Sequence, residues 1–110
     1  MTISPPLRDL GTTRRVTLAG DLSSTTAEAA RAALHAAVEA DGGAGGARAL
    51  RIELPTARLI DSVGLNVLVG IIKRVRATGG EVTIAVAHPS VERILTFTRL
   101  TTLIRLERLS

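Results

Sequence analysis

Asp61 and Ser62 are the residues of this chain whose types and position could carry chemistry. They follow an apolar, strand-like segment at residues 50–54 that ends at Pro55, and they stand where an amphipathic helix is expected to begin. A serine at such a helix start is exposed, and its oxygen is expected to point at backbone N–H groups that have no partner within the helix. A phosphate on that oxygen would be stabilised by these groups and by the positive end of the helix dipole. Ser62 is therefore a candidate switch.

Helix capping is the competing explanation for the same two residues. Asp and Ser are favoured at helix starts because their side chains accept hydrogen bonds from the first backbone N–H groups. Gly64 favours a further role, since a glycine inside a helix costs about 1 kcal/mol relative to alanine. This cost must be offset by a group that approaches Gly64 closely. That group could be another backbone or a phosphate-bearing group of a partner. Taken alone, these residues leave capping and modification both open.

No catalytic or metal-binding pattern is apparent elsewhere in the sequence. His35 and His88 have no partner at metal-ligand spacing and no acid and hydroxyl nearby. The chain has no cysteine, which excludes disulfides, thiol catalysis and cysteine-bound metal. The glycine-rich segment at residues 42–46 lacks the Lys-Ser/Thr ending of a P-loop, and we interpret it as a linker. We expect neither enzyme activity nor a cofactor.

Composition limits the class of protein. The 110 residues suffice for one domain with a single core, and apolar residues make up 45% of them, which excludes a disordered chain. Phe97 is the only large aromatic residue, so the core must be aliphatic. The absence of Trp and Tyr weakens any role in binding single-stranded nucleic acid by stacking.

Charge and hydropathy limit the partners and the location. The net charge of +4 is spread along the chain, which is typical of a solvated surface and compatible with an acidic partner. No helix-turn-helix spacing or clustered basic face predicts direct binding to nucleic acid. No apolar run approaches the roughly 18 residues of a membrane span, and no secretory signal precedes Asp9. We expect a cytoplasmic protein.

Hydrophobic periodicity predicts five strands and three helices. The strands are expected at residues 2–8, 15–19, 49–54, 81–86 and 103–107. The helices are expected from a capping box of Thr25 and Glu28 to about Ala40, at about 63–78 and at about 89–98. Pro5 and Pro6 confine the first strand to an edge at best, and Gly11 would begin its hairpin turn.

The apolar positions predict which face of each element is buried. In the strands they are Leu50, Ile52, Leu54, Val82, Ile84 and Val86; in the helices, Ala30, Ala33, Leu34, Ala37 and Val38, then Leu65, Leu68, Ile72 and Val75, then Val91, Ile94, Leu95 and Thr98. The strands alternate, whereas a parallel sheet covered on both faces would show continuous apolar runs. We therefore predict an α/β (α+β-like) single domain in the order β-β-α-β-α-β-α-β. Its mixed sheet would have four to five strands, with helices packed on one face.

The residues around Ser62 also resemble a known family. Ile60-Asp61-Ser62-Val63-Gly64-Leu65, then Val67-Leu68 and Lys73 through Gly79-Gly80, resemble the signature of STAS domains. The closest subgroup is the bacterial anti-sigma factor antagonists, whose pattern is roughly Asp-Ser-Ser/Thr/Ala-Gly-Leu. Gly20-Asp21-Leu22 with Thr26-Ala27 resembles the family's Gly-Glu-Leu-Asp loop, and residues 89–95 resemble its Ser-Pro-x-Val-x-Arg-Leu helix. The resemblance is strongest over residues 13–107 of the single domain.

The resemblance implies a partner switch. In that family the unmodified antagonist binds an anti-sigma factor with a GHKL-type serine kinase fold and so frees a sigma factor. The kinase phosphorylates the serine after the aspartate, which is Ser62 here, and a serine phosphatase resets the protein. Asp61 would shape the loop, with Val63 and Gly64 beside the phosphosite. The expected partner-binding residues are Asp21, Ser23, Ser24, Thr25, Leu65, Asn66 and Lys73.

Four positions depart from the family pattern. Val63 replaces a small or hydroxyl residue, which leaves Ser62 as the only hydroxyl expected at the junction. Asn66 stands where a second glycine is common, and Ser23 replaces the loop aspartate. Arg99 replaces the glycine that usually precedes Leu100. These departures bear on the identity of the partner and on the efficiency of phosphorylation rather than on the fold.

Two other functions are compatible with parts of the pattern. The chain could be a non-catalytic STAS subunit or scaffold of a membrane transport or signalling complex, in which Ser62 is a cap and the helix from Val63 is a docking surface. A receiver domain that is phosphorylated on Asp61 fits poorly. Such domains resemble one another in an acidic pair after the first strand and a late lysine, whereas Asp21 stands alone and no lysine follows Lys73.

Overall fold

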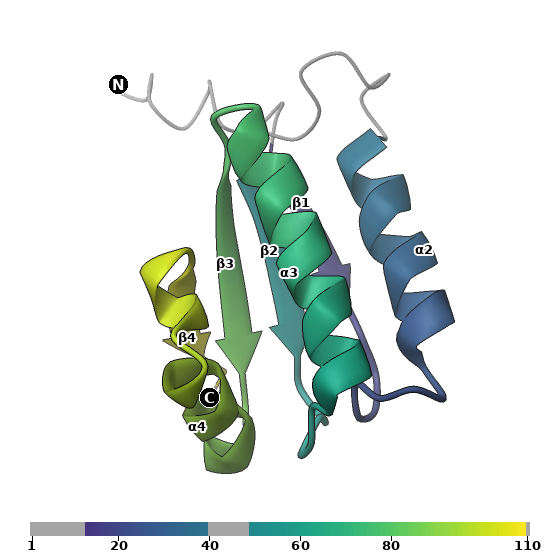
Figure 1. The fold of residues 1–110 in the computed structure, drawn as a ribbon, viewed down its shortest axis with the longest axis vertical. Helices are drawn as coiled ribbons and strands as arrows, with labels where there is room; N and C mark the ends of the chain where they lie inside the picture. The colour runs from purple at the N-terminus through teal and green to yellow at the C-terminus, as the bar shows by residue number, and fades with distance from the viewer. Residues whose placement is uncertain (1–12, 40–48, 110) are drawn as a thin grey trace, which may run out of the picture.

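Four short strands with alternating apolar residues form a parallel sheet. The computed structural model describes residues 13–39 and 49–109. The strands are β1 (Thr13–Thr17), β2 (Ala49–Leu54), β3 (Glu81–Val86) and β4 (Arg105–Arg108). They lie in the order β1-β2-β3-β4, and each pair of neighbours is parallel (Figure 1). Parallel neighbours need long crossover connections, and the helices lie in these connections.

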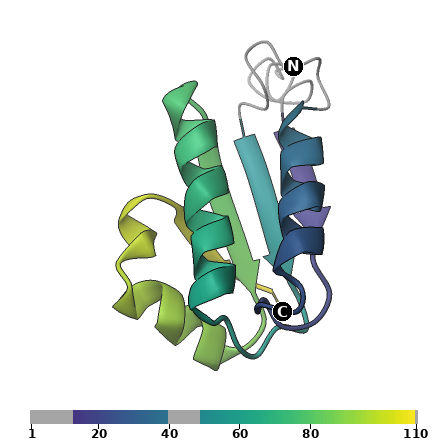
Figure 2. The same cartoon turned by 45° about the vertical axis from the view of Figure 1, so that its right-hand side comes forward.

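In the described residues, three α-helices lie between successive strands. They are α2 (Ala27–Glu39), α3 (Ser62–Ala77) and α4 (Pro89–Phe97), and a 3-10 turn, η1 (Leu100–Thr102), precedes β4. Helices α2 and α3 lie side by side over one face of the sheet, as Figures 1 and 2 show. Pro89 is the first residue of α4, where its missing N–H leaves no hydrogen bond unmade. Among the described residues, no helix combines the length and the apolar character needed to cross a membrane.

The core lies between this helix layer and one face of the sheet. All six predicted inward strand residues are buried, from Leu50 to Val86, and they form one cluster with Leu34, Leu68 and Leu95 of the three helices. The predicted one-sided helix layer and aliphatic core are confirmed. Phe97 is 86% exposed and takes no part in this core.

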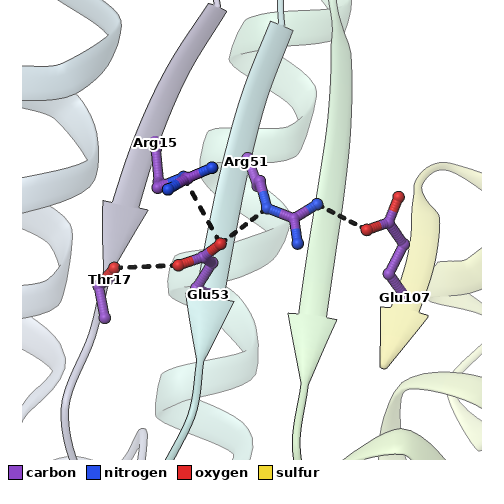
Figure 3. A network of polar contacts seen from close by, with 5 residues as sticks. All are labelled: Arg15, Thr17, Arg51, Glu53 and Glu107. Atoms are coloured by element: carbon purple, nitrogen blue, oxygen red, sulfur yellow. Dashed lines mark hydrogen bonds and ion pairs between the residues drawn. The ribbon is translucent and has the colours of Figure 1, made fainter. Parts of the chain in front are cut away.

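The opposite face of the sheet carries a charged network. Glu53 of β2 accepts a hydrogen bond of 2.8 Å from Arg51 Nε and lies 3.5 Å from Arg15 Nε (Figure 3). Arg51 also donates to Glu107 of β4 at 2.6 Å, and Thr17 donates to Glu53 at 3.3 Å. The hydrogen bond from Arg51 lowers the pKa of Glu53. This polar face explains why the strands alternate although their pairing is parallel.

The α/β fold class is confirmed, and the element boundaries differ modestly from the prediction. The expected strand at residues 2–8, the turn residue Gly11 and the linker at 42–46 lie outside the described residues. The predicted mixed character of the sheet depended on that first strand, and every pairing between described strands is parallel. The last strand begins at Arg105 rather than Leu103, because the chain first forms the turn η1.

The predicted capping box of Thr25 and Glu28 is wrong. Helix α2 begins at Ala27, and the Thr25 hydroxyl bonds instead with the Ser23 hydroxyl at 2.8 Å. The Ser23 N–H donates to Thr26 Oγ1 at 2.9 Å. The hydroxyl groups of this loop therefore satisfy one another, and Glu28 pairs with Arg31 at 3.4 Å.

The predicted core stripe of α3 is shifted by part of a turn. Leu65 is only half-buried, and Gly64, Val67 and Ile71 are buried beside the predicted Leu68, Ile72 and Val75. In α4, Thr98 lies at the exposed end of the helix. The shift follows from a contact that periodicity does not reveal, because Gly64 packs against the backbone of another loop.

Arg99 adopts a left-handed backbone conformation with φ of 64°. A non-glycine residue pays about 1–2 kcal/mol there, because its Cβ crowds the following carbonyl. The family pattern that the sequence resembles has glycine at this position, and glycine adopts this conformation without that cost. This chain keeps an arginine there despite the cost.

Candidate functional site

Two loops at the carboxyl ends of β1 and β2 are joined through their backbones. The Leu22 N–H donates to the Leu59 carbonyl at 3.0 Å, and the Asp61 N–H donates to the Leu22 carbonyl at 3.1 Å. Leu22 and Ile60 thereby form an isolated parallel bridge, with both side chains buried. Because the strands are parallel, both loops leave the same edge of the sheet, and the bridge holds them together.

Two aspartates, one from each loop, add side-chain hydrogen bonds that hold the two loops together. Asp21 Oδ1 accepts hydrogen bonds from the backbone N–H groups of Arg58 at 2.8 Å and Leu59 at 3.2 Å. In return, Asp61 Oδ2 accepts from the Ser24 N–H at 3.0 Å. We name Asp21 and Asp61 the carboxylate clasp, since each loop supplies a carboxylate to the backbone of the other.

Asp61 also caps helix α3. Its backbone is extended, with φ of −91° and ψ of −177°, and its Oδ1 accepts from the Gly64 N–H at 2.9 Å. The hydrogen bond from Gly64 is the largest cause that lowers the pKa of Asp61, and the bond from Ser24 acts in the same direction. The carboxylate is therefore held in its charged form at the first turn of the helix, where the dipole also favours a negative charge.

Ser62 is the first residue of α3, and its side chain is exposed. Among the described residues, no group hydrogen-bonds to its hydroxyl, and the Gly64 N–H is taken by Asp61. We expected the Ser62 oxygen to meet free backbone N–H groups. This expectation is wrong for the Gly64 N–H, because that group already donates to Asp61. The structure thus assigns the cap to Asp61, and it leaves the Ser62 hydroxyl without a hydrogen-bond partner among the described residues.

Gly64 is required by the packing of the two loops. A Cβ at this position would lie 2.3 Å from the Leu22 carbonyl oxygen and 2.7 Å from the Leu22 carbonyl carbon. Both distances are far below any normal contact, and the opposing atoms are backbone. The sequence left open whether another backbone or a partner's phosphate-bearing group approaches Gly64. The structure shows that the backbone of Leu22 does.

The surface around Ser62 is apolar in part. Leu59 is 50% exposed and Val63 is 42% exposed, on either side of Ser62 in the sequence. Ser24 is exposed too, and its N–H bond to Asp61 brings it to the junction. Ser62 is the only hydroxyl residue of the junction segment itself, and the structure adds Ser24 as a neighbour from a loop that lies 37 residues from Asp61 in the sequence.

The structure brings together only some of the predicted partner-binding residues. Asp21 and Ser24 make hydrogen bonds between the two loops, whereas the hydroxyls of Ser23 and Thr25 bond to each other within one loop. Asn66 is exposed on α3. Lys73 lies eleven residues after Ser62 on the same helix, and so about 16 Å along its axis. It lies at a distance from the carboxylate clasp.

Sequence reasoning missed two residues that hold the same loops. The Thr56 hydroxyl accepts from the Gly20 N–H at 2.7 Å, and the Ser90 hydroxyl donates to the Arg58 carbonyl at 2.8 Å. No local pattern marks either residue, since each contact joins segments more than 30 residues apart. Within residues 13–39 and 49–109, no three His, Cys, Asp or Glu side chains group in a way that could hold a metal ion.

Comparison with known proteins identifies the architecture. Residues 5–109 match the family model of the STAS domain. The chain belongs to the STAS domain family. The match includes the carboxylate clasp, Ser62 and all four described strands.

Solved structures share this STAS fold at low sequence identity. A Thermotoga maritima protein assigned as an anti-sigma factor antagonist (tm1081) is 21% identical, with a TM-score of 0.64 over 86% of this chain and 80% of that one. The Bacillus cell fate determinant SpoIIAA in its phosphorylated form is 18% identical, with a TM-score of 0.65 over 90% and 84%. Its unphosphorylated form, named as an anti-sigma factor antagonist, has a TM-score of 0.59 over 90% and 80% at 18% identity.

Replacing Gly64 with alanine tests whether the loop contact requires glycine. We expect Gly64→Ala to lower the free energy of unfolding by about 1–3 kcal/mol, the usual cost of forcing atoms into a packed contact. Gly70→Ala is the matched control, because Gly70 lies in the same helix and a Cβ added there would have nothing within 4 Å. It should gain up to about 1 kcal/mol from helix propensity. Urea denaturation of both variants measures the difference, and a stabilised Gly64→Ala would contradict the contact.

The lowered pKa of Asp61 predicts a pH-dependent contribution to stability. A carboxylate whose pKa is depressed in the folded state stabilises the protein above its unfolded pKa of about 3.9, and this stabilisation is lost as the pH falls through the folded value. Asp61→Asn keeps one acceptor oxygen for two donors, so it should be less stable than the wild type at pH 7. The difference should stay constant above about pH 5 and shrink below about pH 4. Denaturant titrations at several pH values measure it; a difference independent of pH would contradict a charged clasp.

Proposed function

We propose that this protein is an anti-sigma factor antagonist that is switched by phosphorylation of Ser62. In the unmodified form it would bind an anti-sigma factor with a GHKL-type serine kinase fold and release a sigma factor. Phosphorylation would end that binding, and a serine phosphatase would restore it. The protein would then be a cytoplasmic substrate and binding partner rather than an enzyme.

One observation supports this proposal most directly: the exposed Ser62 hydroxyl has no hydrogen-bond partner among the described residues, although it sits on a firmly held turn. Asp61 provides the cap, so the serine is not needed to begin the helix. A kinase can therefore engage the hydroxyl without breaking a bond that stabilises the fold. The carboxylate clasp would present that hydroxyl in one position, which lowers the entropy cost of docking.

The side chains around Ser62 suit a protein interface. Exposed Leu59 and Val63 offer apolar surface that gains free energy when a partner covers it. The adjacent loop contributes Ser24 and the clasp residue Asp21, whose carboxylate is already engaged by backbone N–H groups. Such a surface, with an apolar centre and polar neighbours, is typical of protein interfaces.

A phosphate on Ser62 would oppose that interface through charge. It carries nearly two negative charges and would stand next to Asp61, whose lowered pKa keeps it ionised. The helix terminus tolerates a negative charge, so the fold can accept the modification. A partner that covers Leu59 and Val63 would have to desolvate the phosphate, which is costly unless the charge is paired. Release without unfolding is the expected consequence.

The comparisons are compatible with this function. The Thermotoga protein and the unphosphorylated form of SpoIIAA are both named as anti-sigma factor antagonists. SpoIIAA is known in phosphorylated and unphosphorylated forms, so that protein carries a phosphate on this fold. With identities of 18–21%, these proteins support the proposal by analogy of fold.

The phosphorylation site can be tested by mass spectrometry. Incubation with a cognate GHKL-type anti-sigma kinase and ATP should add one phosphate, and Ser62→Ala should abolish it because no other hydroxyl stands at the first helical position. Ser24→Ala is the matched control, since it removes the second exposed hydroxyl at the junction and should leave the phosphate in place. A phosphate that persists in Ser62→Ala and disappears in Ser24→Ala would move the switch to the other loop.

The release mechanism predicts separate effects of charge and size. Ser62→Asp should weaken binding to the anti-sigma factor by at least about tenfold, because it places an unpaired negative charge in the interface. Ser62→Asn introduces a side chain of nearly the same volume as aspartate without the charge, and it should retain most of the affinity. Calorimetric titration of both variants separates the effects. Equal affinity of Ser62→Asp and wild type would exclude electrostatic release, and co-purification with a permease or ATPase in place of the kinase would favour a transport or scaffold role.

A further inference from the structure

Phe97 lies on a surface that the proposed function does not use. It is the last residue of α4, it is 86% exposed, and it is the only residue of the Phe, Tyr and Trp types in the chain. Single exposed leucines are common on protein surfaces, but a phenylalanine exposes a much larger apolar ring. The core packs without it, so folding does not account for its presence.

The ring borders an open hollow of about 360 Å³. The hollow is lined by Pro89, Glu92, Arg93, Thr96, Phe97 and Arg108. Arg93 and Phe97 are four residues apart on α4, so they share one face of the helix. On the other side of the hollow, Arg108 of β4 donates two hydrogen bonds to the Glu92 carboxylate, of 2.9 and 3.2 Å. This ion pair ties β4 to α4 and makes one wall of the hollow.

Two exposed arginines lie close to Phe97 along the chain. Arg93 lies one turn before Phe97, and Arg99 follows two residues after it. Within the described part of the chain, neither arginine pairs with an acid, whereas Arg108 is neutralised by Glu92. Arg99 is also the only non-glycine residue with positive φ among the described residues. The cation therefore occupies a position where glycine would relieve backbone strain, which indicates a role for its side chain.

We propose that Phe97, Arg93 and Arg99 form a docking surface, the Phe97 surface, for a partner protein that presents an apolar hollow bordered by carboxylates. The ring would insert into the partner's hollow, and the two arginines would pair with its acidic border. Aromatic residues and arginines are the types most enriched where binding energy concentrates. This surface goes beyond the proposed function and does not depend on phosphorylation of Ser62.

Charge distinguishes this partner from the other possible occupants. In a two-fold dimer the same patch meets itself, so Arg93 and Arg99 would face the arginines of a second copy. Segments 1–12 and 40–48 of the same chain each contain one acidic and one basic residue. They therefore carry no net negative charge that would attract the two arginines. An anionic membrane would attract the arginines, but one phenyl ring and two cations make a weak anchor.

A photo-reactive residue in place of Phe97 identifies what contacts this surface. Phe97→benzoylphenylalanine in the full chain, irradiated in its native cells, should give one protein adduct, and the same residue at position 31 on α2 should not. The partner is then purified and titrated. Phe97→Ala should weaken its binding by about tenfold or more. Arg93→Glu and Arg99→Gly should also weaken binding and reduce its dependence on salt.

The controls separate docking from altered folding and from the rival occupants. Arg31→Glu changes the net charge as Arg93→Glu does, on an exposed position of α2, and should bind as the wild type does. Phe97→Ala should keep its unfolding midpoint, because the ring packs against nothing in the core. Adducts only between copies of the chain, or Phe97-dependent sedimentation with phosphatidylglycerol vesicles, would overturn the proposal. A purified partner that binds Phe97→Ala and wild type equally would overturn it as well.

Discussion

The contact between the Leu22 backbone and the first turn of α3 is the constraint on which the site depends. A carbonyl that would lie 2.3 Å from any Cβ at position 64 allows only glycine there. That contact sets the rotation of α3, which is why Gly64, Val67 and Ile71 face the core and Leu65 is only half-buried. It also brings the loop after β1 close enough for the carboxylate clasp to form. One steric requirement therefore links the helix start, the two loops and the serine between them.

The division of roles between Asp61 and Ser62 follows from that arrangement. Both residue types are common caps, and either one could have satisfied the first N–H groups of α3. Asp61 has two oxygens and uses them for two donors, Gly64 in its own helix and Ser24 in the other loop. Ser62 is left at the first helical position, and its hydroxyl bonds to none of the residues that the structure describes. Under the proposed function, a phosphate could be added to this hydroxyl without breaking a hydrogen bond that holds the fold.

The sheet shows how a parallel arrangement can keep one polar face. Its helices α2, α3 and α4 all contribute to a single aliphatic core on one side. The other side carries Arg15, Arg51, Glu53 and Glu107, joined across three of the four strands. Charges spread along this face in both signs discourage association of one sheet with another. The two surfaces proposed to bind partners lie at the ends of helices: Ser62 where α3 begins, and the Phe97 surface where α4 ends.

Local patterns in the sequence determined the strands, the helices and the inward residues from Leu50 to Val86, because burial on one face imposes a period that the residues themselves display. They also placed Asp61 and Ser62 at a helix start and showed that Gly64 had to be offset by some close approach. Only the tertiary structure decided what approaches Gly64, which residue caps α3, that Ser24 joins the site, and that Arg99 is strained. The cap depends on which of two neighbouring side chains accepts from the Gly64 N–H. The other features depend on a backbone angle or on contacts between segments far apart in the chain, and neither of these causes produces a periodic pattern in the sequence.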